Sequence, residues 1–198
     1  MSSRKGGRLR DKWRMKKWFT VYSPPYFGGN DIAAIPASDD EKVLSRVIET
    51  SLYNLTKQDM SQMNIKMYFQ VTDIKGERVE TVFKGHEYSR EYLRSLVRRG
   101  GTRMDGIFDV PVKDGYGVRA YAAAFSRRRL NPSQENAIRR IMREILLEKG
   151  KDLNFDQLAQ ELVLGKVASD IYNKAIKIAP LRHVGVRKSK LIEMPKAA

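Results

Sequence analysis

Two strand–turn–strand segments constrain the fold of this chain more than any other feature. The first occupies residues 65–84 and turns at Asp73-Ile74-Lys75-Gly76. The second occupies residues 104–125 and turns at Asp114-Gly115, a dipeptide that favours tight hairpins. Both are rich in β-branched and aromatic residues. Because an isolated hairpin is barely stable in water, they predict a larger antiparallel sheet within residues 18–126.

Residues 43–55 fit two patterns of secondary structure. The β-branched Val47 and Ile48 favour a strand. The same two residues also share a helical face with Leu44 and Leu52. We expect a strand here.

The segment 83–103 predicts a short helix between two strands. The first strand ends at Gly85, and the helix begins near Ser89. It ends in Arg98-Arg99 ahead of two glycines, because cations and a left-handed glycine suit a helix C-terminus. Three apolar residues at helical spacing should face the core: Leu93, Leu96 and Val97.

The character of the sequence changes at residue 131, where a helical half begins. Asn131-Pro132-Ser133-Gln134 supplies an N-cap, a proline at the first helical position and a capping-box glutamine. The helix should run to about residue 149. Two further amphipathic helices are expected over residues 154–164 and 166–179. Residues 181–192 alternate weakly and predict either a strand or an extended arm.

The elements together predict the α+β class. We expect one globular domain over residues 18–180, β-rich in 18–126 and helical in 131–180. Basic segments flank it, a 1–17 arm and a 181–198 C-terminal segment. The arm has too few apolar residues to fold alone, so we expect it to be disordered and to become ordered on a polyanion. The alternative is a solubilising tail.

The charge balance points to the partner of this protein. Lysine and arginine number 38 against 23 acidic residues, a formal net charge of +15. Such an excess indicates a polyanion, most commonly nucleic acid. An anionic membrane would want a basic amphipathic helix or a lipidation signal, and neither is evident, so we expect no membrane partner. The chain has no cysteine, which excludes disulfides and cysteine-based metal sites.

The candidate RNA-binding residues form four clusters. They lie in the arm, at the end of the short helix, at the end of the second hairpin and in the C-terminal segment. Tryptophans in and beside the arm, Trp13 and Trp18, favour RNA contact because an indole stacks on bases. The cations are Arg4, Arg8, Arg10, Lys12, Arg14, Lys16, Lys17, Arg98, Arg99, Arg103, Arg127, Arg128, Arg129, Arg187, Lys188 and Lys190.

Catalytic signatures are not evident in the sequence. The two histidines, His86 and His183, are distant in sequence, and no metalloprotease, nucleophile-elbow, P-loop or dinucleotide-binding motif is present. Asp105 and Asp109 would lie roughly 13 Å apart along one strand face, too far for one metal ion. We therefore expect those two carboxylates to be structural or charge-balancing. We also expect no enzyme, no cofactor, no metal site and no small-molecule substrate.

Four sequence blocks resemble a known family. They are FKGHE at 83–87, YLRSLVRR at 92–99, KDGY at 113–116 and IRRIMRE at 138–144. With the collinear stretches around them, from residue 16 to 190, they resemble the small-subunit ribosomal protein family of archaea and eukaryotes called S-three-A-e or e-S-one. The short C-terminus is similar to the archaeal form, because eukaryotic members carry a longer charged extension.

This resemblance implies a fold and a place of action. It implies an antiparallel β-barrel-like core with helices packed beside it. It implies a cytoplasmic ribonucleoprotein role in translation, on the small-subunit platform near the mRNA exit. The implied partners are ribosomal RNA, neighbouring platform proteins and, as a further candidate, mRNA near the exit. The rivals are a free-standing RNA-binding factor or RNA chaperone, and an RNA-processing enzyme.

Overall fold

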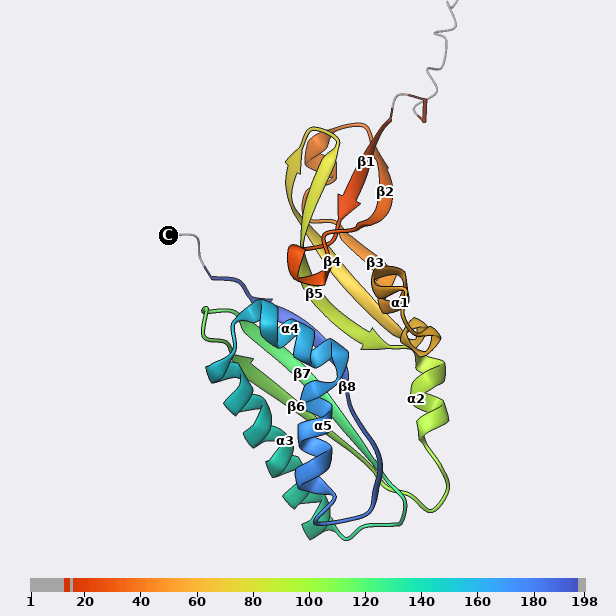
Figure 1. The fold of residues 1–198 in the computed structure, drawn as a ribbon, viewed down its shortest axis with the longest axis vertical. Helices are drawn as coiled ribbons and strands as arrows, with labels where there is room; N and C mark the ends of the chain where they lie inside the picture. Colours follow the sequence, from red (N-terminus) through yellow and green to blue (C-terminus); the bar gives the residue numbers. More distant parts are fainter. Residues whose placement is uncertain (1–12, 15, 196–198) are drawn as a thin grey trace, which may run out of the picture.

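The computed structural model describes residues 13, 14 and 16–195, and its elements form an elongated α+β protein (Figure 1). The strands are β1 (Lys17–Tyr22), β2 (Asp31–Ala37), β3 (Val47–Ser51), β4 (Ile65–Lys75), β5 (Arg78–Tyr88), β6 (Arg103–Pro111), β7 (Gly117–Ser126) and β8 (Leu181–Glu193). The helices are α1 (Leu52–Thr56), α2 (Arg90–Leu96), α3 (Pro132–Asp152), α4 (Phe155–Leu164) and α5 (Lys166–Ala175). The α+β class and the three C-terminal helices are confirmed.

The eight strands form one sheet that is not closed into a barrel within the described residues. The order is β2-β1-β5-β8-β7-β6, and β4 pairs with both β5 and β3. Strand β5 pairs with two different strands along the same edge. Its first residues pair in parallel with β1, as at Val21 and Val79, and its last pair with β8, as at Gly85 and Lys190. Because β5 changes partners midway, the sheet divides into two parts that share this strand (Figure 1).

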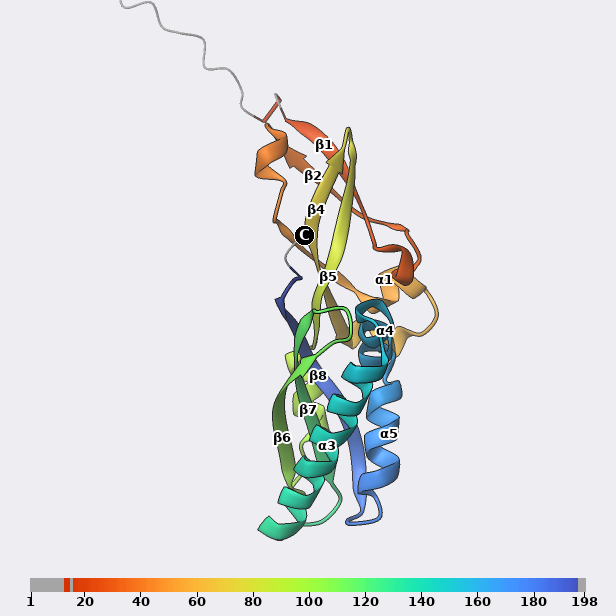
Figure 2. The ribbon, with the colours of Figure 1, turned by 90° about the vertical axis from the view of Figure 1, so that its left-hand side faces the viewer.

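Each part of the sheet has its own hydrophobic cluster. In the part formed by β1 to β5, Phe19, Val21 and Val79 pack with Val43 and Ile48. In the part formed by β5 to β8, helices α3, α4 and α5 cover one face of the sheet (Figure 2). The helices can approach closely because alternate residues of β7 are buried alanines: Ala120, Ala122 and Ala124.

Residues 43–55 contain both of the predicted alternatives. The strand expectation is confirmed for β3 but wrong at both ends, since residues 43–46 form a turn and helix α1 begins at Leu52. The Ser51 hydroxyl accepts a hydrogen bond from the Asn54 N–H at 3.3 Å. That cap converts the end of a strand into the start of a helix, because it satisfies an N–H that has no partner within the helix.

Helix α2 differs most from its prediction. Its cap is as expected, since the Ser89 hydroxyl accepts from the Tyr92 N–H at 3.2 Å. However, β5 continues past Gly85 to Tyr88, and the helix ends at Leu96 rather than at the arginines. The expected core stripe is also wrong: Leu93 and Leu96 are half-buried and Val97 is 49% exposed. The helix instead packs through Tyr92, whose ring meets those of Tyr88 on β5 and His183 on β8 edge to face.

The helical half follows its sequence signals closely. Gln134 accepts from the N–H of Asn131 at 3.2 Å, so the capping box of α3 is confirmed. Gln157 repeats the arrangement with Asn154 at 3.3 Å at the start of α4. The chain after α5 takes the strand alternative. Strand β8 lies in the sheet interior, between β5 and β7.

A buried histidine links the two parts of the sheet. His86 on β5 is fully buried, with Nε2 2.8 Å from the Val186 carbonyl oxygen and Nδ1 2.7 Å from the Ser189 hydroxyl. Since a carbonyl only accepts, Nε2 carries the proton and Nδ1 accepts from the hydroxyl. Burial lowers the pKa of His86 to about 4. The neutral imidazole is therefore a structural group that joins β5 to β8.

We expect the free energy of unfolding to fall when the pH drops from 7 to 5. The unfolded chain takes up a proton near the ordinary histidine pKa of 6.5, whereas the folded chain resists it until about 4. The stabilisation is therefore complete above pH 6.5 and is lost as pH falls toward 4, with about 2 kcal/mol gone by pH 5. Urea denaturation at both pH values measures it. His86→Gln should remove the His86 share of this slope and leave the share of His183, whose pKa burial also lowers, and a flat wild-type profile would contradict the assignment.

Candidate RNA-binding surface

Five of the predicted arginines lie on two neighbouring loops. Arg98 and Arg99 follow α2, and Arg127, Arg128 and Arg129 follow β7. All five side chains are exposed, and none forms an ion pair with a carboxylate in the part of the chain that the structure describes. We call residues 97–102 and 127–131 the arginine loops. Because no described carboxylate neutralises these guanidinium groups, they can pair with an external anion.

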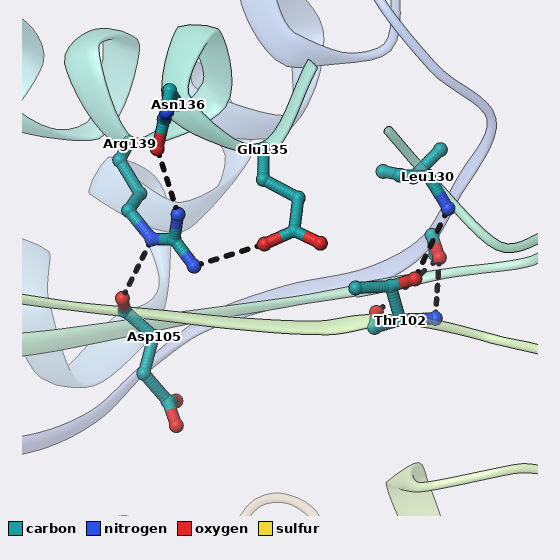
Figure 3. Close-up of polar contacts among 7 residues, drawn as sticks. Thr102, Asp105, Leu130, Glu135, Asn136 and Arg139 are labelled. Atoms are coloured by element: carbon teal, nitrogen blue, oxygen red, sulfur yellow. Dashed lines mark hydrogen bonds and ion pairs between the residues drawn. The ribbon is translucent and has the colours of Figure 1, made fainter. Parts of the chain in front are cut away.

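Hydrogen bonds hold the arginine loops together at Thr102 (Figure 3). The Thr102 N–H donates to the Ser126 hydroxyl at 2.8 Å, and the Ser126 N–H donates to the Thr102 carbonyl at 3.0 Å. The Thr102 hydroxyl in turn accepts from the Leu130 N–H at 3.1 Å. A side chain at Gly101 would bring its Cβ within 2.6 Å of the Ser126 carbonyl oxygen, so glycine permits this approach. The two arginine clusters therefore share one rigid base.

A third loop contributes cations that sequence reasoning missed. The Arg127 N–H donates to the Pro180 carbonyl at 3.0 Å, which joins the turn between α5 and β8 to the arginine loops. That turn carries the exposed Lys177, and the half-buried Arg182 is the second residue of β8 beside it. All three loops lie at the lower end of the molecule in both ribbon views (Figures 1 and 2). Only the pairing of β7 with β8 reveals this proximity.

Arg103 lies at the base of the surface and is already partly engaged. Its guanidinium is 2.9 Å from the Asp105 carboxylate and 6.0 Å from the Phe125 ring centroid. A second arginine, Arg139 of α3, is partly exposed but bonds to three groups of the fold. It donates to the Asp105 carbonyl at 3.3 Å and to Glu135 at 3.1 Å, and thereby ties α3 to β6 (Figure 3).

The structure separates the C-terminal cluster from the arginine loops. Arg187 lies 3.6 Å from Asp105, and Lys188 lies 2.6 Å from Glu87, so both are paired within the sheet. Lys190 is exposed and forms no ion pair with any described carboxylate. Since a strand rises about 3.3 Å per residue, Lys190 lies roughly 30 Å along β8 from Leu181.

The arm is described only in part. Arg4, Arg8, Arg10 and Lys12 lie outside the described residues, and their contact with RNA stays a prediction. Arg14 and Lys17 are exposed, and Lys16 lies 4.1 Å from the ring centroid of Trp13. Trp13 and Trp18 meet edge to face at 6.4 Å. These residues lie at the end of the molecule opposite the arginine loops (Figure 1).

The carboxylates that sequence analysis considered for metal binding are paired with arginines. Asp109 accepts two hydrogen bonds from Arg119, at 2.6 and 2.9 Å, and these lower the pKa of the carboxyl. Asp105 pairs with Arg103 and Arg187. The charge-balancing role is confirmed. Among the described residues no cluster of three histidine or acidic side chains could hold a metal ion. No described helix is long and apolar enough to cross a membrane.

The fold and surface define a strongly basic α+β protein with five exposed arginines gathered on two neighbouring loops. Its sequence matches the Ribosomal S3Ae family over residues 4–195, and the chain belongs to that family. The resemblance seen in the sequence blocks is thereby confirmed.

Curated relatives carry the name "Small ribosomal subunit protein eS1". The protein of Desulfurococcus amylolyticus is 46% identical over 98% of this chain and 91% of its own length. That of Staphylothermus marinus is 44% identical over 98% of this chain and 92% of its own length. That of Aeropyrum pernix is 46% identical over 96% of this chain and 90% of its own length.

Proposed function

We propose that this protein is a structural component of the small ribosomal subunit that binds ribosomal RNA and neighbouring proteins. We place it on the platform near the mRNA exit, in the cytoplasm, with mRNA as a further candidate partner. Family membership and the names of the relatives support the subunit. The observation that carries RNA binding is the group of five exposed arginines without carboxylate partners among the described residues, on loops that Thr102 joins.

Binding through the arginine loops would follow from charge and geometry. A guanidinium presents donors in a planar fork that matches phosphate oxygens two at a time. Because hydrogen bonds already fix the loop backbones at Thr102, little backbone entropy is lost when the loops bind RNA. Phosphates are contacted at positions set by the shape of the RNA, so affinity would depend more on RNA structure than on base sequence.

Exposed apolar side chains mark where protein neighbours would contact the chain. Ile107 on the edge strand β6 is 58% exposed, Leu164 at the end of α4 is 62% exposed and Met60 is 72% exposed. They lie away from the arginine loops. Such side chains are suited to protein interfaces, where aromatic and apolar anchors replace charge.

Sedimentation of native lysate through sucrose gradients tests the proposal. At low and moderate salt the protein should travel with the small subunit, because many phosphate contacts and apolar protein contacts act together. High salt should release it progressively, since each phosphate contact releases counterions. If the protein stays at the top of the low-salt gradient, the ribosomal assignment fails and a free-standing RNA-binding factor replaces it.

A further inference from the structure

A second candidate site lies where β5 passes between β4 and β8. The sheet has a hollow of about 280 Å³ there. Its lining includes one aromatic ring, one glycine and four charged side chains: Tyr68, Gly85, Lys84, Glu87, Lys188 and Lys190. This hollow is distant from the arginine loops, since Lys190 lies roughly 30 Å along β8 from Leu181, and the neighbouring Pro180 bonds Arg127 in those loops.

The register of three strands creates the hollow. Tyr68 of β4 is paired with Gly85 of β5, and Gly85 is paired on its other side with Lys190 of β8. Neighbouring strands lie about 4.8 Å apart, so the tyrosine and the lysine stand roughly 10 Å apart across a residue without a side chain. The gap is a fixed feature of the fold, because a Cβ on Gly85 would overlap the Ser189 carbonyl group.

The charge around the hollow favours an anion. Three lysines face one glutamate in its lining, and Glu49, which pairs across from Tyr68, is neutralised by Lys66 at 2.7 Å. Lys188 is held 2.6 Å from Glu87, and Lys84 donates to Gln70 at 2.8 Å. Lys190 is exposed and has no carboxylate partner among the described residues. The site therefore combines a half-buried aromatic ring on one side with an unpaired cation on the other.

The geometry points to a pocket for one unpaired RNA nucleotide, an inference that rests on the proposed function. The base lies over Gly85 against the Tyr68 ring, and its phosphate meets Lys190. Bases stack on aromatic side chains, and unpaired nucleotides are the ones whose faces are free to do so. Pockets for drug-sized ligands start at about 300 Å³, so this hollow suits a single planar group. An acidic peptide would satisfy the lysines but would leave the ring without a partner.

Titration of the full-length chain with single nucleotides tests this pocket. The probes are AMP, GMP, CMP and UMP, with ribose 5-phosphate as the ligand that lacks a base. Amide signals of Gly85 and Lys190 in NMR spectra should shift and saturate with at least one nucleotide. Ribose 5-phosphate should bind at least about tenfold more weakly, since stacking on an aromatic ring contributes most of the affinity. Equal affinity for both, or no saturation, overturns the proposal.

Matched variants separate the ring from the charge. Tyr68→Ala should weaken nucleotide binding about tenfold, and Tyr68→Phe should leave it within about twofold because the ring remains. Lys190→Gln, at an exposed position that does not threaten folding, should weaken nucleotide and ribose 5-phosphate alike. Lys113→Gln, at the exposed turn after β6, is the charge control. If Tyr68→Ala and Lys190→Gln both bind like wild type, the site is not there.

The nucleotide-binding experiment and the sedimentation experiment can fail independently of each other. Tyr68→Ala should still sediment with the small subunit, because the arginine loops are unchanged. A chain that binds nucleotides in this pocket but stays at the top of the gradient would refute the subunit assignment alone. A chain that sediments with the subunit but shows no saturable nucleotide binding would refute the pocket alone.

Discussion

Gly85→Ala should destabilise the protein by at least about 3 kcal/mol, because a methyl group there collides with backbone atoms that cannot move separately. The new Cβ would lie 2.9 Å from the Ser189 carbonyl carbon and would overlap its oxygen. That backbone belongs to β8, whose Ser189 hydroxyl also bonds the buried His86. Relief requires β8 to move away from β5, and this breaks the pairing that joins the two parts of the sheet.

A second glycine separates this clash from backbone strain. Gly85 has φ +153° and Gly76 has φ +67°, so alanine is strained at both. At Gly76, in the turn between β4 and β5, an added methyl group would have no atom within 4 Å, and Gly76→Ala should cost only about 1 kcal/mol. Urea denaturation of both variants at pH 7 gives the two values. Similar losses in both variants would contradict the role of Gly85 at the strand junction.

Local signals in the sequence predicted the elements whose stability is local. The start of α3 follows from Asn131 and Gln134, because a capping box is complete within four residues. Helix α2 shows the limit of this reasoning. Its apolar spacing indicates a face, but Val97, just past the end of the helix, is 49% exposed. A pattern of apolar residues predicts which side chains share a face and leaves open whether another element covers it.

Contacts between segments that are distant in the sequence determine which cations of the candidate site lie together and which are ion-paired. The arginine loops are neighbours because Thr102 bonds Ser126 across 24 positions of sequence. Lys188 is held by Glu87, which is 101 positions away. The charge of each residue was evident from its type, but the strand order decides whether a carboxylate of the fold already pairs with it. Sequence therefore identified the cations, and only the pairing of β5, β7 and β8 shows which of the described ones are unpaired.

Replacing the five arginines of the arginine loops by glutamine should reduce RNA affinity by about three orders of magnitude at 0.1 M salt. If each contacts one phosphate, the five supply a salt slope of roughly 3.5 to 4.5 log units of affinity per tenfold change in salt. The variant should therefore lose both affinity and salt dependence. Fluorescence anisotropy with small-subunit ribosomal RNA fragments, from low to high salt, measures both quantities.

A variant of equal charge tests whether position or net charge matters. Five other cations are ion-paired within the fold and lie away from the arginine loops: Lys42, Lys66, Lys75, Arg119 and Lys166. Replacing these by glutamine also lowers the net charge by five, from the +15 of the natural chain. Because those cations already have carboxylate partners, this variant should keep most of its affinity and salt slope. If both variants lose affinity equally, binding follows net charge, and the arginine loops are not the RNA-binding surface.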